Sequence, residues 1–246
     1  MLEVCVEDAG GIAAAVMGRG DRVELCSALA LGGLTPPRSL VRVAAEAPIA
    51  VHMLCRPREG DFAYDAQEVA QVRDDIDLAA EMGLAGIVIG AGSAAGLDLP
   101  VLREWLDHAR RAGLARGAPL SVTLHRVFDL LDDMESGLEQ AVAMGFDRIL
   151  TSGGAVRAAD GAERLAQLCR QAAGRIVILA GSGVSAETIP VLAAAGIREF
   201  HGSCRTAGTA PAGGSRLEQL GFQKGARMVT DAREVARVKA AIAAVT

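Results

Sequence analysis

One pattern recurs four times along the chain: an Ala-rich helical stretch, a glycine, a short apolar stretch and then a polar or Gly-rich turn. The four copies lie at residues 15–27, 79–91, 141–154 and 192–204. The glycine stands where the end of a helix favours a left-handed residue. The apolar stretches are rich in Val, Ile and Leu without regular alternation, which is typical of strands covered on both faces. The pattern predicts repeated helix and strand units around a parallel sheet.

Four further apolar stretches bring the number of expected strands to eight. They lie at residues 2–6, 48–54, 120–124 and 175–181. Between the strands, segments such as 65–83 and 133–145 carry apolar residues three or four positions apart, which indicates amphipathic helices. Eight strands, each followed by a helix, predict an α/β fold: a single-domain (β/α)8 TIM barrel that spans residues 1–246.

The alternative architecture for such a pattern is an open, doubly wound sheet. That fold carries a G-x-G-x-x-G motif after its first strand, whereas here the first strand is followed by EDAGG at residues 7–11. The barrel is therefore favoured. Residues 205–216 are poor in large apolar side chains and rich in Gly, Ala and Pro, which predicts a flexible loop after the eighth strand rather than a domain boundary.

Charge and hydropathy argue against several classes of partner. The net charge is −5 and the basic residues form no run, so no nucleic-acid partner is expected. No apolar stretch reaches about 18 uncharged residues, so no membrane span is expected. The first residues, MLEVCVED, lack the basic and apolar regions of a secretory signal, which favours a cytoplasmic protein. In that compartment the five cysteines are expected to be free thiols.

Polar side chains gather where the expected strands end. In a barrel of this type the chemistry lies at the carboxyl ends of the strands, and burying an unpaired charge is costly, so these residues need a partner or a function. The residues are Glu3, Cys5, Glu24, Cys26, His52, Arg56, His125, Arg126, Asp129, Thr151, Ser152, His201 and Ser203. A structural explanation stays open for Glu3 and Glu24, which could pair with Arg56 or Arg126 in a buried ionic network.

Two of the strands carry the same motif, Glu-x-Cys, within LEVCV at 2–6 and RVELC at 22–26. Residues two apart on a strand point to the same face, so each cysteine points the same way as its glutamate. Neighbouring strands lie about 4.8 Å apart, so the thiols of Cys5 and Cys26 come within reach of one soft ion if the register matches. Thiolates favour Cu(I), with zinc as a competitor. The other explanation is that both cysteines are ordinary barrel packing.

Three turns at the strand ends have the composition of anion sites. Glycine lets backbone N–H groups approach a ligand closely, and the start of a helix adds partial positive charge. The loops after the seventh and eighth strands are the usual phosphate site of this fold. The turns supply Ser152 and Gly153, then Gly181, Ser182 and Gly183, and finally His201, Gly202 and Ser203, with Arg56 as an additional cation. They predict a site for a small anionic molecule.

Taken together, these motifs resemble the CutC copper-homeostasis family. The matching stretches are, in order, LEVCV, DRVELCSALALGGLTP, VHMLCRPREGDFAY, LHRVFD, RILTSGG, AGSGV and EFHGS, and they extend from residue 2 to about residue 204. The resemblance implies a (β/α)8 barrel, a cytoplasmic location, a link to copper handling, and Cu(I) bound by Cys5 and Cys26. Cys55 stands where the family more often has an aliphatic residue, so it is not counted as a ligand.

Two functions are compatible with these observations. The first is a copper homeostasis protein that binds Cu(I) through Cys5 and Cys26. The second is an enzyme with isomerase- or lyase-type acid–base chemistry on a small anionic or phosphorylated substrate. Its expected catalytic residues are Glu24, His125, Arg126, Asp129 and His52, with Glu24 or His125 as the general base. A scaffold without chemistry is disfavoured by the many titratable groups at one end of the barrel, and a homodimer is the expected assembly.

Overall fold

In the computed structural model, which describes residues 1–208, 215–223 and 225–245, eight parallel strands close into a barrel. Their order around the barrel is β1, β2, β3, β4, β7, β8, β9 and β10, and β10 pairs with β1 to close it. The strands are Leu2–Val6, Arg22–Leu25, Ala50–Leu54, Gly86–Ile89, Ser121–Leu124, Arg148–Thr151, Val177–Ala180 and Glu199–Gly202. Each lies within one of the apolar stretches of the sequence, so the predicted (β/α)8 barrel is confirmed.

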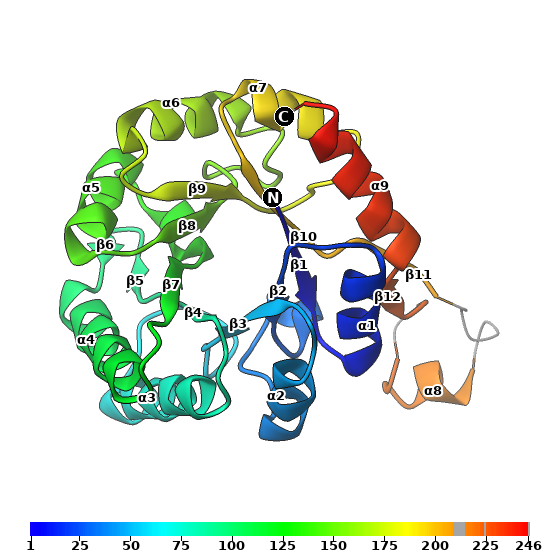
Figure 1. Cartoon of the computed structure of the whole chain (residues 1–246), viewed down its shortest axis with the longest axis horizontal. Coiled ribbons are helices and arrows are strands. Elements are labelled where there is room, and N and C mark those ends of the chain that lie inside the picture. Colours follow the sequence, from blue (N-terminus) through cyan, green and yellow to red (C-terminus); the bar gives the residue numbers. More distant parts are fainter. Residues whose placement is uncertain (209–214, 224, 246) are drawn as a thin grey trace.

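Helices form a ring around the outside of the barrel (Figure 1). They are α1 (Ala9–Met17), α2 (Arg38–Ala45), α3 (Ala66–Glu81), α4 (Leu99–Ala115), α5 (Met134–Met144), α6 (Ala162–Ala172), α7 (Ile189–Ala194) and α9 (Ala232–Ala243). Five of them begin after an aspartate whose carboxylate accepts N–H groups of the first turn. The left-handed residue expected after each Ala-rich helix is a glycine in three copies, but in the first copy Arg19 adopts it instead of Gly18.

Shorter elements occupy the connections. β5 (Gly92–Ser93) and β6 (Gly96–Leu97) form a small hairpin between β4 and α4, and the 3-10 turns η1 (Leu29–Leu31) and η2 (Arg126–Leu130) follow β2 and β7. β11 (Arg205–Ala207) pairs with β12 (Met228–Thr230), and α8 (Arg216–Gln219) lies between them in the sequence. The predicted loop at 205–216 is therefore wrong for residues 205–207, and its residues 209–214 lie outside the described part of the chain.

An ionic network fills the barrel interior near the start of the strands. Arg22 is 2% exposed and donates to Glu3 at 2.5 Å and to Glu199 at 3.0 Å. Arg148 donates to the same Glu199 at 2.9 Å. Glu3 is therefore part of a buried ionic network, but its arginine partner is Arg22 rather than Arg56 or Arg126. The reason is that Glu3 lies opposite Arg22 in the β1–β2 register.

The apolar core lies mainly between the barrel and the helices. Trp105 of α4 is fully buried, and its Nε1–H donates to the backbone oxygen of Val69 in α3 at 3.1 Å. Tyr64 packs on the same indole, with 5.8 Å between ring centres. None of the helices in the described ranges is long and apolar enough to cross a lipid bilayer.

Candidate functional site

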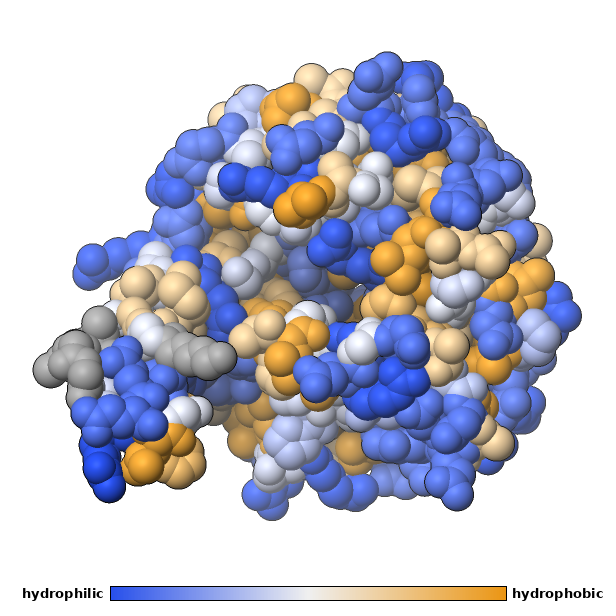
Figure 2. All heavy atoms as spheres, turned by 180° about the vertical axis from the view of Figure 1, so that it is seen from behind, coloured by the Kyte–Doolittle hydropathy of each residue, from blue (hydrophilic) through white to orange (hydrophobic). Residues whose placement is uncertain are grey.

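A cavity of about 420 Å³ opens at the carboxyl ends of the strands, within the size range of small-molecule sites. Figure 2 shows the molecule from the side opposite to Figure 1, with a hollow near the middle of that face. The predicted residues that line the cavity are Cys5, Glu24, Arg56, His125, Arg126 and His201, together with the loop residues Ser182, Gly183, Gly202 and Ser203. The predicted residues outside its lining are Cys26, His52, Asp129, Ser152, Gly153 and Gly181.

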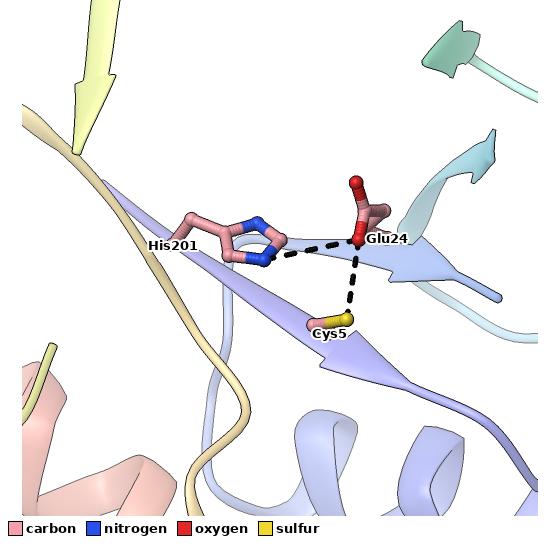
Figure 3. A group of neighbouring side chains, drawn as sticks. All are labelled: Cys5, Glu24 and His201. Atoms are coloured by element: carbon pink, nitrogen blue, oxygen red, sulfur yellow. Dashed lines mark hydrogen bonds and ion pairs between the residues drawn. The ribbon is translucent and has the colours of Figure 1, made fainter. Parts of the chain in front are cut away.

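The pairing of β1 with β2 places a cysteine against a glutamate. In this parallel register Cys5 lies opposite Glu24, just as Glu3 lies opposite Arg22. The two Glu-x-Cys motifs are therefore staggered by two residues rather than level with each other. The Cys5 thiol donates a hydrogen bond to Glu24 Oε2 at 3.1 Å (Figure 3).

Cys26 lies behind Cys5, away from the cavity. Its Sγ is 3.8 Å from Cys5 Sγ and 3.4 Å from the backbone oxygen of Val6. It is fully buried in a small apolar cluster with Leu54 and Val88. The two thiols therefore lie close to each other even though the motifs that carry them are staggered.

His201 of β10 lies between the two glutamates. Its Nδ1 is 2.8 Å from Glu3 Oε1. Its Nε2 is 3.8 Å from Glu24 Oε2 (Figure 3). Burial disfavours the charged imidazolium, but the carboxylates of Glu24 and Glu3 outweigh burial and raise the pKa of His201 above its usual value. His201 therefore stays positively charged over a wider pH range than a free histidine.

The pKa values of the two buried glutamates are shifted in opposite directions. Burial opposes the charge of Glu3, but the hydrogen bond from His201 and the guanidinium of Arg22 outweigh burial and hold the pKa of Glu3 well below its usual range. Burial, together with repulsion from Glu3, raises the pKa of Glu24. Glu24 is therefore the carboxyl group of the cavity wall that is best suited to take up and release a proton.

Cys5, Glu24 and His201 offer ligand atoms that all lie within 4.8 Å of one another. The sequence predicts Cys5 as a metal ligand, but it does not predict that His201 lies beside it. The pairing of β10 with β1, which sets His201 opposite Glu3, brings them together. The hydrogen bond with Cys26 and burial raise the pKa of Cys5 well above its usual value, so a cation must displace the thiol proton to bind here.

The ring of His125 is a neutral hydrogen-bond donor. Its Nδ1 accepts the backbone N–H of Val127 at 3.0 Å, which leaves the ring proton on Nε2. Burial and the nearby charge of Arg56 lower the pKa of His125 to about 3. With its proton on Nε2, His125 is placed to donate to a carbonyl or carboxylate oxygen, as neutral catalytic histidines do elsewhere, which favours Glu24 over His125 as the predicted general base.

The turn after β8 binds an anion, but the anion is a side chain of the protein. Asp129 accepts the N–H of Ser152 at 3.0 Å and the hydroxyl of Thr151 at 2.5 Å, while Arg126 Nε donates to it at 2.7 Å. The N–H of Gly153 is bonded to the Thr151 hydroxyl oxygen at 2.9 Å. The N–H groups of Ser152 and Gly153, predicted to bind a substrate anion, are therefore bonded within the protein, and Asp129 orients Arg126 rather than lining the cavity.

The loops after β9 and β10 keep free donors at the cavity. Within the described ranges, the N–H groups of Gly183, Val184 and Ser203 donate no hydrogen bond to another residue. The N–H of Gly181 and the hydroxyl of Ser182 are bonded to backbone oxygens at 3.0 and 2.7 Å. Of the three predicted anion turns, these two retain N–H groups that an external anion could use.

His52 is a core residue of the barrel. Its Nδ1 lies 3.9 Å from Glu3 Oε2, and burial lowers the pKa of His52 to about 4. A Cβ at Gly86 would lie 2.8 Å from the His52 ring, so that glycine makes room for it. His52, predicted as a catalytic residue, therefore does not line the cavity.

Arg56 lines the cavity beside an aromatic ring from its own loop. Its Cζ is 4.9 Å from the centre of the Phe62 ring. Its guanidinium donates to the backbone oxygens of Leu31, Gly33 and Gly60 at 3.0–3.1 Å. The expected pairing of Arg56 with Glu3 or Glu24 is therefore wrong, since its partners are carbonyl groups.

Comparison with known proteins gives a consistent result. The sequence profile of the CutC family matches residues 1–206. A CutC family protein of Sinorhizobium medicae (strain WSM419) is 46% identical over 98% of this chain and 96% of its own length. One of Caulobacter vibrioides (strain NA1000 / CB15N) is 51% identical over 82% of this chain and 80% of its own length. Among solved structures, a CutC from Streptococcus agalactiae, provisionally described as a copper homeostasis protein, has a TM-score of 0.73 at 29% identity, over 82% of this chain and 98% of its own.

Proposed function

The chain belongs to the CutC family, and on this basis we propose that it serves copper homeostasis by binding Cu(I) through the thiolates of Cys5 and Cys26. The observation that carries the proposal is the 3.8 Å distance between the two Sγ atoms. With metal–sulfur bonds of about 2.3 Å, two thiolates on one ion lie at most about 4.6 Å apart, so these two need little movement to share an ion. Soft thiolate ligands select Cu(I) over harder ions.

The cavity supplies the route by which an ion reaches the thiols. Cys5 lines the cavity and Cys26 lies behind it, so an ion would meet Cys5 first. Glu24 accepts the hydrogen bond of the Cys5 thiol and is placed to take its proton and pass it to the cavity. His201 and Glu24 would then contact the bound ion or support its ligands. The proposal places the protein in the cytoplasm, where thiols stay reduced, and includes a homodimer as its assembly.

Zinc is the competing ion. Cys5, Glu24 and His201 form a thiol, carboxylate and imidazole set, which zinc accepts more readily than Cu(I) does. The two ions therefore favour different partners of Cys5. Cu(I) favours the thiol of Cys26, and zinc favours the Glu24 carboxylate and the His201 imidazole on the cavity side.

An anaerobic Cu(I) competition titration tests the proposal. The wild type is expected to bind one equivalent, and Cys5→Ser and Cys26→Ser are each expected to bind at least tenfold more weakly. Cys169→Ser is the matched control, because Cys169 is a half-buried cysteine of α6 outside the site. Equal Cu(I) binding by the wild type and the two site variants, or no binding by any of them, would contradict the proposal.

The raised pKa of Glu24 at the wall of a cavity favours a second candidate, an acid–base enzyme for a small anionic substrate. Glu24 would be the proton carrier, and the free N–H groups of Gly183, Val184 and Ser203 would hold the anion. Arg126, oriented by Asp129, would add positive charge.

Hydrogen exchange at carbon tests this second function without knowledge of the product. Small 2-oxo acids and sugar phosphates are incubated with the protein in D2O, and deuterium uptake next to the carbonyl group is followed by NMR. The wild type and the surface variant Glu187→Gln are expected to catalyse exchange, and Glu24→Gln to lose at least a hundredfold in rate. An undiminished rate in Glu24→Gln, or no exchange with any compound, would refute the role of Glu24.

A further inference from the structure

Two arginines are buried in the described part of the chain, and only one of them has a carboxylate partner there. Arg22 is 2% exposed and pairs with the carboxylates of Glu3 and Glu199. Arg56 is 6% exposed, and no ion pair within the described ranges includes it. A buried charge is costly unless it is paired, so the positive charge of Arg56 needs a counter-charge that the described residues do not supply.

The hydrogen bonds of Arg56 leave part of its guanidinium free. Nη1 donates to the backbone oxygens of Leu31 and Gly33, and Nη2 donates to that of Gly60. These bonds use three of the five guanidinium protons. The Nε of Arg56 is buried and has no hydrogen-bond partner among the described residues. The carbonyl groups fix the orientation of the side chain but leave its charge uncompensated.

His125 contributes a second unsatisfied donor. Its Nδ1 is occupied by the N–H of Val127, so its proton is on Nε2, and this buried Nε2 has no partner among the described residues. A Cβ at Gly90 would lie 2.4 Å from the His125 ring, so the β4 backbone packs directly against the imidazole. The ring is thus held in one orientation with its donor unused, which is uncommon for a buried polar group and needs an explanation.

Arg56 and His125 belong to the same wall of the cavity. Phe62 contacts both: its ring centre is 4.7 Å from that of His125 and 4.9 Å from Arg56 Cζ. All three side chains line the cavity. Arg56 and Phe62 come from the loop between β3 and α3, and His125 directly follows β7, whereas Cys5, Glu24 and His201 come from β1, β2 and β10. The wall is therefore a separate sector of the barrel mouth.

We propose that Arg56 and His125, with Phe62 packed between them, form a subsite that binds a carboxylate group of a small-molecule ligand. The carboxylate would supply the missing counter-charge of Arg56 and accept the Nε2–H of His125. This inference rests on the second candidate function for its ligand and names the substrate class, a small carboxylic acid. It does not depend on copper binding at Cys5 and Cys26.

Charge balance favours a carboxylate over a phosphate at this subsite. Arg56 carries one uncompensated positive charge, and His125 is neutral, so one negative charge completes the balance. A phosphate dianion would bring a second negative charge, whereas Arg126, which also lines the cavity, already pairs with Asp129. The free N–H groups of Gly183, Val184 and Ser203 lie on the other loops and suit the phosphate instead. A ligand with its carboxylate at Arg56 would extend toward Glu24 and Cys5 within the 420 Å³ cavity.

Ligand-dependent thermal unfolding tests the subsite, with propionate and inorganic phosphate as probes at constant ionic strength. Propionate is expected to raise the Tm of the wild type in a saturable way. Arg56→Met is expected to lose this response, and Arg56→Lys to weaken propionate binding about tenfold, because lysine keeps the charge without the planar donor set. His125→Asn is expected to weaken it several-fold, since asparagine can still accept the N–H of Val127 but has no group in place of Nε2–H.

Arg116→Gln is the matched control. Arg116 also donates only to backbone oxygens, those of Ala80, Ala118 and Pro119, but it does not line the cavity. Its propionate response should equal that of the wild type. If phosphate binds and propionate does not, or if Arg56→Lys and His125→Asn bind propionate as well as the wild type, the subsite is refuted and the second function stands. If neither probe binds, both are refuted.

Discussion

Cys5 lies directly opposite Glu24 in the parallel pairing of β1 and β2, and its thiol donates a 3.1 Å hydrogen bond to the Glu24 carboxylate. The same thiol is 3.8 Å from Cys26. Cys5 therefore stands between a soft partner on one side and a proton acceptor on the other. This position connects the proposed copper site to the acid–base group of the cavity.

Cu(I) binding at neutral pH should release at least one proton per ion, from Cys5. The pKa of Cys5 is raised well above its usual value, so the thiol is protonated before the ion arrives. The apparent affinity should then rise about tenfold per pH unit for each proton released. Anaerobic calorimetry in two buffers with different ionisation enthalpies measures the proton count. A count of zero in the wild type would show that Cys5 is not a ligand.

Glu3→Gln should destabilise the protein by about 3–5 kcal/mol, because Arg22 and His201 would each lose a buried carboxylate partner. The pKa of Glu3 is lowered in the folded state, so its stabilisation is present above its unfolded value of 4.5 and declines as the pH falls below that value. Urea unfolding at pH 7 and pH 3.5 measures both effects. Glu187→Gln, at an exposed ion pair, is the control and should cost under about 1 kcal/mol. If Glu3→Gln lowered the free energy of unfolding as little as Glu187→Gln does, the stabilising role of the buried network would be contradicted.

Acid should destabilise the wild type between about pH 6.5 and pH 4 through His52. Burial lowers the pKa of His52 to about 4, so the unfolded chain binds a proton in this window that the folded protein does not. Stability from this group is present above pH 6.5 and is lost as the pH falls. His52→Asn should reduce the slope of the unfolding free energy against pH by about 1.4 kcal/mol per pH unit. Unfolding curves at several pH values measure the slope, and an unchanged slope would show that His52 titrates normally.

Asp129→Asn should destabilise the β8 turn and disorder Arg126. The carboxylate accepts hydrogen bonds from Ser152, Thr151 and Arg126, and an amide group can replace only part of them. The free energy of unfolding is expected to fall by about 2–3 kcal/mol, because several charge-assisted hydrogen bonds are weakened. Asp132→Asn is the control, because the Asp132 carboxylate accepts no hydrogen bond from another described residue. Equal unfolding free energies for the two variants would show that the turn does not need the charge of Asp129.

The sequence predicted the barrel well because its evidence is local. Each helix and strand is encoded by residue spacing within a few positions, and the recurrence of the unit limits the architectures that can satisfy it. The same local rule placed Cys5, Glu24, His125 and His201 at the strand ends. It failed at Gly18, because the left-handed residue after helix α1 is Arg19 instead.

Contacts between side chains on different strands could not be predicted from residue spacing along the chain. The sequence left open a pairing of Glu3 with Arg56 or Arg126, whereas the β1–β2 register pairs it with Arg22. The sequence predicted that the turn after β8 binds a substrate, whereas the Asp129 carboxylate from the β7 connection accepts the N–H of this turn. His125 was expected to be a base, but the N–H of Val127 fixes its proton on Nε2.

The sequence by itself determined that this chain forms a (β/α)8 barrel and that Cys5, Glu24 and His201 lie on strands facing its mouth, because residue spacing along the chain encodes the strands and the alternation of their side chains. Only the tertiary structure decided which of those side chains meet. Register, barrel closure and loop packing set Cys5 against Glu24, brought His201 between two glutamates and left Arg56 without a carboxylate. These contacts join residues up to 198 positions apart, and their energies depend on burial and charge that exist only after the barrel closes.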